Sequence, residues 1–308
     1  MPCLAFPKNK LHMTMDPKTN PNRAFLDQKR FPWPSWMRGH VERIKALWRM
    51  PRAMKWATRL LGPQYARSRN RIEIDITYRC NLRCLNCNRS INTAPSNQSM
   101  TLGQIQQFID DSVAVGKAWK SIRILGGEPT LHPEFRTIIS MLRDYRTRHN
   151  EGCSIEVISN GHGPAVQAQL DWLPADIFIE NTAKQSNVTP FFRPFSDAPI
   201  DDKRYDSADY RNGCQVISSC GMGLGPTGYF QCTVAAGIDR VMGMGIGRTR
   251  LPEDTDDMHD QMLATCRLCG RFKDGHFIPK DLRPSLREQV ISPTWKKIYA
   301  DYHAKKTD

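Results

Sequence analysis

Three cysteines of this chain fall within eight residues in the spacing C-x3-C-x2-C, at Cys80, Cys84 and Cys87. Thiolates bind iron–sulfur clusters, and three of them can hold three irons of a 4Fe-4S cube while the fourth iron has no protein ligand. Structural zinc is one alternative, but zinc sites normally close with four ligands and this block offers three, without a histidine. Three metal-free thiols are the other alternative. The spacing favours a cluster with one open iron, where chemistry can take place.

Two further polar motifs follow predicted strands. Gly126-Gly127-Glu128-Pro129 comes directly after the predicted strand 121–125. Its glycines let the backbone approach a ligand closely, and Glu128 can accept hydrogen bonds from an ammonium group. Ser159 and Asn160 follow the predicted strand 154–158. The sequence therefore predicts a ligand site at the ends of these strands.

The cysteine block and the Gly-Gly-Glu motif together resemble the signature of the radical S-adenosylmethionine (radical SAM) enzymes. The resemblance implies a 4Fe-4S cluster on the three cysteines, with its free iron chelated by SAM, and reductive cleavage of SAM to methionine and a 5'-deoxyadenosyl radical. It also implies that Gly126, Gly127 and Glu128 bind the amino group of SAM, and that Ser159 and Asn160 lie near its ribose or carboxylate.

Asn86 departs from the family pattern. Members usually carry an aromatic residue before the third cysteine, beside the adenine. The change affects that contact and leaves cluster ligation intact. A further candidate is Arg193, which follows a predicted strand and is expected to bind the SAM carboxylate or to handle a proton.

Strands alternate with helices through the middle of the chain. Strands are predicted at 71–78, 121–125, 154–158 and 176–180, and helices at 101–118, 134–148 and 165–172. This alternation favours an α/β fold with a parallel sheet. The resemblance implies a partial (β/α)6 radical SAM barrel, which we assign to residues 71–200.

Five more cysteines follow, at Cys214, Cys220, Cys232, Cys266 and Cys269. A β-hairpin predicted between Cys220 and Cys232, followed by the C-x2-C pair, makes a plausible four-thiolate site. Residues 201–278 resemble the SPASM and twitch auxiliary-cluster regions of radical SAM enzymes, with one auxiliary 4Fe-4S cluster. Zinc is again the alternative. The fourth ligand is either Cys220, which fits the hairpin motif, or Cys214, whose spacing to Cys232 resembles that of a twitch aminocyclitol dehydrogenase.

The formal charge of +13 over 308 residues is unevenly distributed, because residues 1–70 hold 15 Lys and Arg against 3 Asp and Glu. This N-terminal extension begins rich in proline and then carries apolar residues at helical spacing from about Ser35 to Leu61, interrupted at Pro51. Such a basic amphipathic helix either packs on its own protein or contacts an acidic partner, a nucleic acid or a membrane surface. Residues 279–308 form a tail without recognisable chemistry.

No secretory signal and no membrane-spanning run is recognised, so a reducing cytoplasm is expected. We expect an enzyme, a radical SAM oxidoreductase or epimerase, that dehydrogenates or epimerises a small polyol or aminocyclitol. A peptide or protein maturase is the second hypothesis, and a non-catalytic iron–sulfur protein that binds nucleic acid or membrane is the third. Either enzyme would need a one-electron reductant such as flavodoxin or ferredoxin. The substrate itself stays open.

Overall fold

Six strands form one mostly parallel sheet in the order β4-β3-β2-β1-β5-β6. The computed structural model describes residues 34–184, 186–188, 194–276, 278, 282 and 286–307. The strands are β1 (Arg71–Thr77), β2 (Ser121–Gly126), β3 (Ser154–Ser159), β4 (Phe178–Asn181), β5 (Met222–Gly225) and β6 (Gly228–Phe230). Neighbours from β4 to β5 are parallel, and β6 runs antiparallel to β5. The predicted α/β class with a mostly parallel sheet is confirmed.

The last two strands are the hairpin predicted between Cys220 and Cys232. It turns at residues 226–227, and β5 pairs with β1 through Ile72↔Met222 and Ile74↔Leu224. The cysteine-rich region therefore extends the sheet of residues 71–181 instead of standing apart from it. Four strands come from βα units, and the hairpin completes the six.

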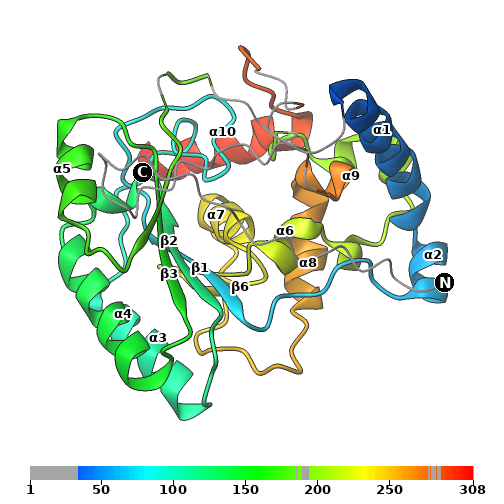
Figure 1. The fold of residues 1–308 in the computed structure, drawn as a ribbon. Helices are drawn as coiled ribbons and strands as arrows, with labels where there is room; N and C mark the ends of the chain where they lie inside the picture. Colours follow the sequence, from blue (N-terminus) through cyan, green and yellow to red (C-terminus); the bar gives the residue numbers. More distant parts are fainter. Residues whose placement is uncertain are drawn as a thin grey trace.

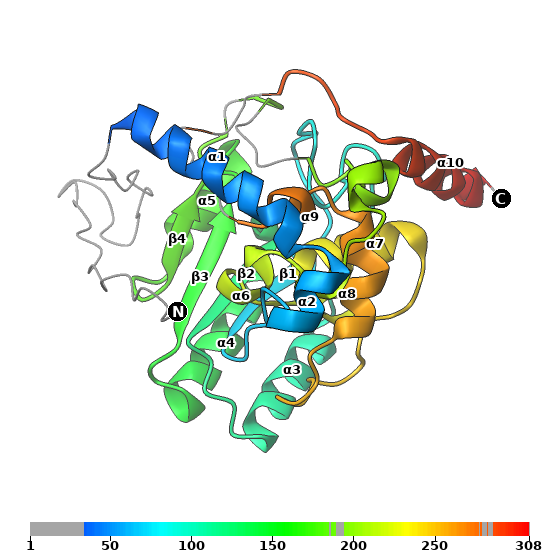
Figure 2. The same ribbon diagram turned by 90° about the vertical axis from the view of Figure 1, so that its right-hand side faces the viewer.

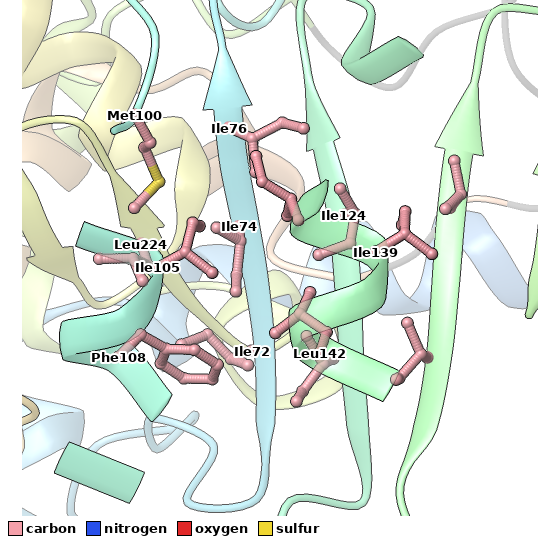
Figure 3. Packing of buried hydrophobic residues seen from close by; sticks show 14 of the residues in the cluster. Ile72, Ile74, Ile76, Met100, Ile105, Phe108, Ile124, Ile139, Leu142 and Leu224 are labelled. Carbon is pink, nitrogen blue, oxygen red and sulfur yellow. The ribbon is translucent and has the colours of Figure 1, made fainter. Parts of the chain in front are cut away.

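Side chains alternate strictly along β1. Ile72, Ile74 and Ile76 point to one face, where α3 (Leu102–Ala114) and α4 (Phe135–His149) cover them in a fully buried core, as Figure 3 shows. Glu73 and Asp75 point to the opposite face, because successive side chains of a strand alternate. We call this opposite, charged surface the inner face of the sheet.

The remaining helices surround this sheet (Figure 1). They are α1 (Ser35–Arg52), α2 (Lys55–Leu61), α5 (Pro164–Trp172), α6 (Gln215–Ser219), α7 (Thr233–Met242), α8 (His259–Thr265), α9 (Arg271–Asp274) and α10 (Pro293–Thr307). Short 3-10 turns are η1 (Pro129–Leu131), η2 (Pro199–Asp201), η3 (Lys203–Tyr205), η4 (Tyr210–Asn212) and η5 (Cys266–Leu268). A second buried core, built largely on α7, α8, α9 and α10, lies against the hairpin.

The break predicted at Pro51 is found next to it, since α1 ends at Arg52 and α2 begins at Lys55. One predicted helix is shorter in the structure. The helix predicted over 101–118 ends at Ala114, because Gly116 takes a left-handed φ of 59° that a helix cannot continue through. None of the described helices is long and apolar enough to cross a membrane.

Candidate functional site

The loop after β1 carries the first three cysteines. Cys84 is buried, and Cys80 and Cys87 are half-buried. Burial raises the pKa of Cys80 to about 11, and the nearby Cys87, Glu128 and Cys84 add to this effect. The three thiols thus share one environment. Among the described residues, no three His, Cys, Asp or Glu side chains converge on a point that one ion could occupy. A 4Fe-4S cube instead uses one thiolate for each iron.

Hydrogen-bond donors surround these sulfurs. The Sγ of Cys80 accepts from the backbone N of Leu82 at 3.4 Å and lies 3.8 Å from Nδ2 of Asn160. The Sγ of Cys84 lies 3.9 Å from Nζ of Lys184. Burial raises the pKa of Cys84, and the Lys184 charge opposes that rise. Donors of this kind favour the thiolate form, which is the form that binds iron.

The Gly-Gly-Glu loop is fixed to the residues that lead into the cysteine loop. The N–H groups of Gly127 and Glu128 donate to the carbonyls of Thr77 and Arg79, both at 2.8 Å. A Cβ on Gly126 would lie 2.1 Å from the Thr77 carbonyl oxygen, and one on Gly127 would lie 2.3 Å from that of Arg79. Both glycines therefore allow two strand ends to approach each other, a role that the sequence alone did not indicate.

Glu128 is fully buried and uses its carboxylate within the protein. It accepts from the hydroxyls of Thr130 and Ser159, at 2.8 and 2.9 Å, and from the backbone N of Asn160 at 2.7 Å. Burial raises its pKa, and these hydrogen bonds oppose the rise. The structure thus brings Glu128, Ser159 and Asn160 together next to Cys80. Contact of any of them with SAM stays a prediction.

Asn86 is buried in a left-handed conformation with φ of 56°. Its Nδ2 donates to the carbonyl of Glu288 at 2.9 Å, and its Oδ1 accepts from the N–H of Val290 at 2.8 Å. The side chain that replaces the usual aromatic residue therefore joins the cysteine loop to the segment before α10. Its predicted place beside the cofactor is not tested. Arg193, the remaining candidate, lies outside the described residues.

A second set of thiols gathers between α7, α8 and α9. One cavity is lined by Cys214, Cys232, Cys266 and Cys269. Burial raises the pKa of Cys269 to about 12 and that of Cys214 as well, and in both cases the charge of Arg271 opposes the rise. Nearby, the side-chain oxygen of Gln231 is buried without a hydrogen-bond partner in the described part of the chain. We call these four cysteines the four-thiol set.

Cys220 does not line that cavity. Burial raises its pKa to about 12, and its strongest charged neighbours are Glu73 and Arg123 on the inner face of the sheet. Of the two candidates for a fourth ligand, the structure therefore groups Cys214 with Cys232, Cys266 and Cys269. Cys220 lies between that cavity and the inner face of the sheet, since Arg271 and Cys214 are also among its charged and thiol neighbours.

The inner face holds a network that sequence reasoning missed. Arg123 of β2 pairs with Glu73 of β1, with Glu156 of β3 at 3.2 Å and with Glu180 of β4 at 2.7 Å. Its ion pairs therefore connect all four strands from β1 to β4. Arg89 pairs with Asp75 at 3.1 Å. The signal was present in the alternation of isoleucine and charged residues along β1, since a strand of a parallel sheet buried on both faces is normally apolar throughout.

Thr233 connects this network to both thiol sets. Its hydroxyl accepts from Arg89 at 2.7 Å and donates to Glu73 at 2.7 Å. Arg89 is two residues beyond Cys87, and Thr233 directly follows Cys232. The buried Arg89–Thr233 hydrogen bond therefore links the two cysteine loops.

Comparisons with known proteins identify a family for the middle of the chain. Residues 74–174, from β1 through α5, match the family model of the radical SAM superfamily. The match identifies residues 74–174 as a radical SAM domain. The family prediction from the cysteine block is thereby confirmed.

Relatives cover a limited part of this radical SAM protein. A GTP 3',8-cyclase of Campylobacter jejuni is 33% identical over 88 residues, which is 29% of this chain and 28% of the cyclase. A GTP 3',8-cyclase of Corynebacterium glutamicum is 30% identical over 107 residues, 34% of this chain and 28% of the cyclase. The matched segment thus spans about 28% of the length of each of these relatives. A crystal structure of BtrN in complex with AdoMet and 2-DOIA aligns with 68% of this chain and 89% of that chain, at 12% identity and a TM-score of 0.36.

Membership in the radical SAM superfamily implies a 4Fe-4S cluster and SAM, and the first three cysteines fit that cluster. They offer sulfur ligands only, they lie at the carboxyl end of β1, and amide and ammonium donors point at two of them. Cys80 and Cys87 also remain partly accessible, as an open iron site requires.

Proposed function

We propose that this chain is a radical SAM enzyme that reductively cleaves SAM and abstracts hydrogen from a substrate C–H bond. The supporting observation is the meeting of Cys80, Cys84 and Cys87 with the Gly-Gly-Glu loop and the end of β3, at one edge of the sheet. When bound there, the cluster supplies the electron that cleaves SAM. Ligand sites at the carboxyl ends of parallel strands are the rule in α/β proteins.

The protein's own residues hold this arrangement. Cys80, Cys84 and Cys87 would each take one iron. Asn160 and Lys184 would donate to the thiolate sulfurs, and so stabilise their negative charge. Glu128 keeps the N–H of Asn160 and the hydroxyl of Ser159 in place. A flavodoxin or ferredoxin is the proposed reductant.

The four-thiol set is the proposed ligand set of one auxiliary 4Fe-4S cluster. Its support is the shared cavity of Cys214, Cys232, Cys266 and Cys269, with Arg271 close enough to Cys214 and Cys269 to favour their thiolates. Such a cluster would supply an acceptor for one electron. Four protein ligands would leave it no open iron, in contrast to the first site.

The proposed reaction is dehydrogenation of a small polyol or aminocyclitol. The support for a polar substrate is the charged character of the inner face, where Arg89 and Arg123 pair with the four carboxylates Glu73, Asp75, Glu156 and Glu180. Cys220 favours epimerisation as a second outcome, because its thiol lies near Glu73 and Arg123 and could return a hydrogen atom to a substrate radical. The thiyl radical left behind would take one electron from the proposed reductant and one proton to restore the thiol.

The iron and sulfide content of anaerobically reconstituted protein tests the proposal. About eight irons are expected in the wild type and about four in the variant with Cys80, Cys84 and Cys87 changed to Ala. Cys153→Ala is the matched control, because Cys153 is buried away from both thiol sets, and it should keep all eight. A wild type with about four irons and a triple variant with none would contradict the auxiliary cluster, and with it the dehydrogenation as proposed.

Product analysis separates the two reactions. Dehydrogenation gives one 5'-deoxyadenosine for each oxidised product. Epimerisation instead places solvent deuterium on an inverted carbon, and Cys220→Ala should then abolish turnover while SAM cleavage continues. Intact SAM after incubation with a strong reductant would contradict the proposal as a whole.

A further inference from the structure

Helix α1 contacts the rest of the protein through polar groups. Arg49 is buried, and its guanidinium donates to the carbonyls of Gly213 at 2.6 Å and Phe272 at 2.8 Å. It also lies 4.5 Å from the centre of the Phe272 ring. Glu42, on the same helix, binds His276 at 2.6 Å. The side of α1 that faces the protein is therefore its polar side.

The apolar side of α1 faces away from the protein. Its large side chains Ile44, Leu47 and Trp48 are 65%, 77% and 63% exposed. Helix α2 continues the pattern with Trp56, Leu60 and Leu61, which are 58%, 77% and 63% exposed. These six are a majority of the ten exposed large apolar side chains in the described residues. We call them the α1–α2 face.

This arrangement reverses that of an ordinary surface helix, which buries its apolar stripe and exposes its charges. The expectation that the stripe packs on its own protein holds for Met54 and Ala57, and Met50 of α1 also packs on the second core, but the six side chains of the α1–α2 face remain exposed. Figure 1 places α1 and α2 on the opposite side of the molecule from α3, α4 and α5, and in Figure 2, seen from that side, they lie toward the viewer. Apolar patches of this extent on a soluble protein mark an interaction site.

Charge restricts what can cover this face. Exposed cations flank it at Arg43, Lys45, Lys55 and Arg59. Over residues 34–70 the only acidic residue is Glu42, which already pairs with Lys45 and His276. A second copy of the chain would bring these like charges together, and so it is disfavoured. The complementary partner is anionic.

A cationic groove adjoins α2. Lys55 and Arg59 line it together with Arg211 and Arg267, in a cavity of about 680 Å³. Asp209 also lines it but is paired with Arg211 at 2.6 Å, which leaves Asp206 as its other acid. Positive charge therefore outweighs negative charge in the groove, which extends the cationic surface beyond the two helices.

We propose that the α1–α2 face and this groove dock the protein on the surface of a bilayer that contains anionic phospholipid. Tryptophan and leucine with lysine and arginine beside them are the composition of helices that lie in the membrane interface. The apolar side chains enter the acyl boundary, and Lys55 and Arg59 meet the phosphate groups. Docking of this kind is peripheral.

Sedimentation with vesicles tests the proposal on the full reconstituted chain. Vesicles of phosphatidylcholine with phosphatidylglycerol should sediment the wild type, and vesicles of phosphatidylcholine alone should do so at least about tenfold less, since each basic residue near an anionic surface contributes about 1 kcal/mol. Binding should weaken as salt rises, because charges are screened beyond about 8 Å at physiological ionic strength.

Two exposed residues provide the decisive variant. Leu47→Ser with Trp48→Ser removes apolar area from the face and should lower binding by at least about tenfold. Val113→Ser with Val115→Ser removes exposed apolar side chains at the end of α3, far from the face, and should leave binding unchanged. Lys55→Gln with Arg59→Gln should lower binding to anionic vesicles and flatten its salt dependence. All variants should keep the wild-type iron content and thermal midpoint.

Three results would overturn the proposal. One is a wild-type chain that stays in the supernatant with anionic vesicles. Another is a Leu47/Trp48 variant that sediments like the wild type, because another part of the chain would then carry the binding. The third is equal loss in the Val113/Val115 control, which would make the effect nonspecific.

Discussion

The two thiol sets differ in their surroundings. The first lies on an irregular loop at the carboxyl ends of the strands, and Cys80 and Cys87 remain partly accessible. The four-thiol set lies between helices, where Cys232, Cys266 and Cys269 are buried and Cys214 is half-buried. With the proposed clusters bound, three thiols would leave one iron open to an exogenous molecule, whereas four would leave none. The number of thiols is therefore the basis on which we propose a reactive site and a closed one.

Their neighbours differ as well. Side-chain donors from Asn160 and Lys184 reach the first set directly. Arg271 influences Cys214 and Cys269 of the second set through its charge. Arg49, which ties α1 to this region, does the same for Cys214. The second set therefore depends on the packing of remote elements, and the first depends on the strand ends and, through Asn86, on the segment before α10.

The largest expected effect is the loss of SAM cleavage on substitution in the first thiol set, which the four-thiol set should not share. Cys84→Ala should reduce SAM cleavage to below detection, because enzymatic rate accelerations of at least about 10⁶-fold are lost with the cluster. Cys269→Ala should keep SAM cleavage within about threefold of wild type while product formation stops. Chromatography of 5'-deoxyadenosine and product measures both. Loss of SAM cleavage in both variants would remove the distinction between the sets.

Arg49 offers a test of the dependence on packing. Arg49→Ala leaves the buried carbonyls of Gly213 and Phe272 without their donor, which should lower the free energy of unfolding by about 3 kcal/mol. Iron should fall by about four atoms per chain, all from the four-thiol set. Denaturant unfolding and iron analysis measure these changes.

Arg43→Ala is the matched control for Arg49, since Arg43 is an exposed arginine on the same helix. It should change the free energy of unfolding by less than about 0.5 kcal/mol. Loss of iron from the first set in Arg49→Ala would contradict the separate support of the two sets.

The sequence alone predicted the features that depend on local residue patterns. The spacing of Cys80, Cys84 and Cys87 identified the family, and β1 and the turn at 226–227 followed from apolar alternation and turn residues. It left the choice between Cys214 and Cys220 open. Both lie at compatible distances along the chain, and only the pairing of β5 with β1 turns Cys220 toward Glu73 and Arg123.

Contacts between distant segments could not be predicted from the sequence either, because they also depend on how the whole chain folds. Asn86 looked like a missing aromatic residue, and its bonds to Glu288 and Val290 cross about two hundred positions. The α1 stripe has the spacing of a packed helix, and no local pattern states that Arg49 is the residue that turns inward. Direction of burial is a property of the whole fold.

Asn86 permits a test of how the first set is supported. Asn86→Leu removes both hydrogen bonds to residues 288 and 290 and places a branched side chain at positive φ, so it should cost about 2 to 3 kcal/mol of unfolding free energy. Asn86→Asp tolerates that φ but loses the donor to Glu288, and about 1 kcal/mol is expected. Thermal unfolding and hydrogen exchange over 286–292 measure the two.

Asn88→Leu controls for the loop itself, because within the described residues the Asn88 side chain makes no hydrogen bond. It should cost less than Asn86→Asp. If all three variants lose the same stability, the loop is sensitive to any substitution. The loss in the Asn86 variants would then not come from the hydrogen bonds to residues 288 and 290.

Cys153 is a buried thiol that belongs to neither thiol set, and so it shows the effect of burial alone. The change expected on its substitution is the smallest of these predictions. It is 4% exposed on the far side of the sheet, and burial raises its pKa to about 11. A thiol whose folded pKa lies above its unfolded value stabilises the folded state below the unfolded pKa, and this contribution is lost as pH rises through the folded pKa. Stability should therefore fall between pH about 9 and about 11, by no more than about 2 kcal/mol from this group. Cys153→Ala should show a shallower fall over that window in denaturant unfolding of metal-free protein. If the stability of the variant falls equally steeply with pH, burial does not raise the pKa of the Cys153 thiol. The raised pKa values of the four-thiol set would then need a cause other than burial.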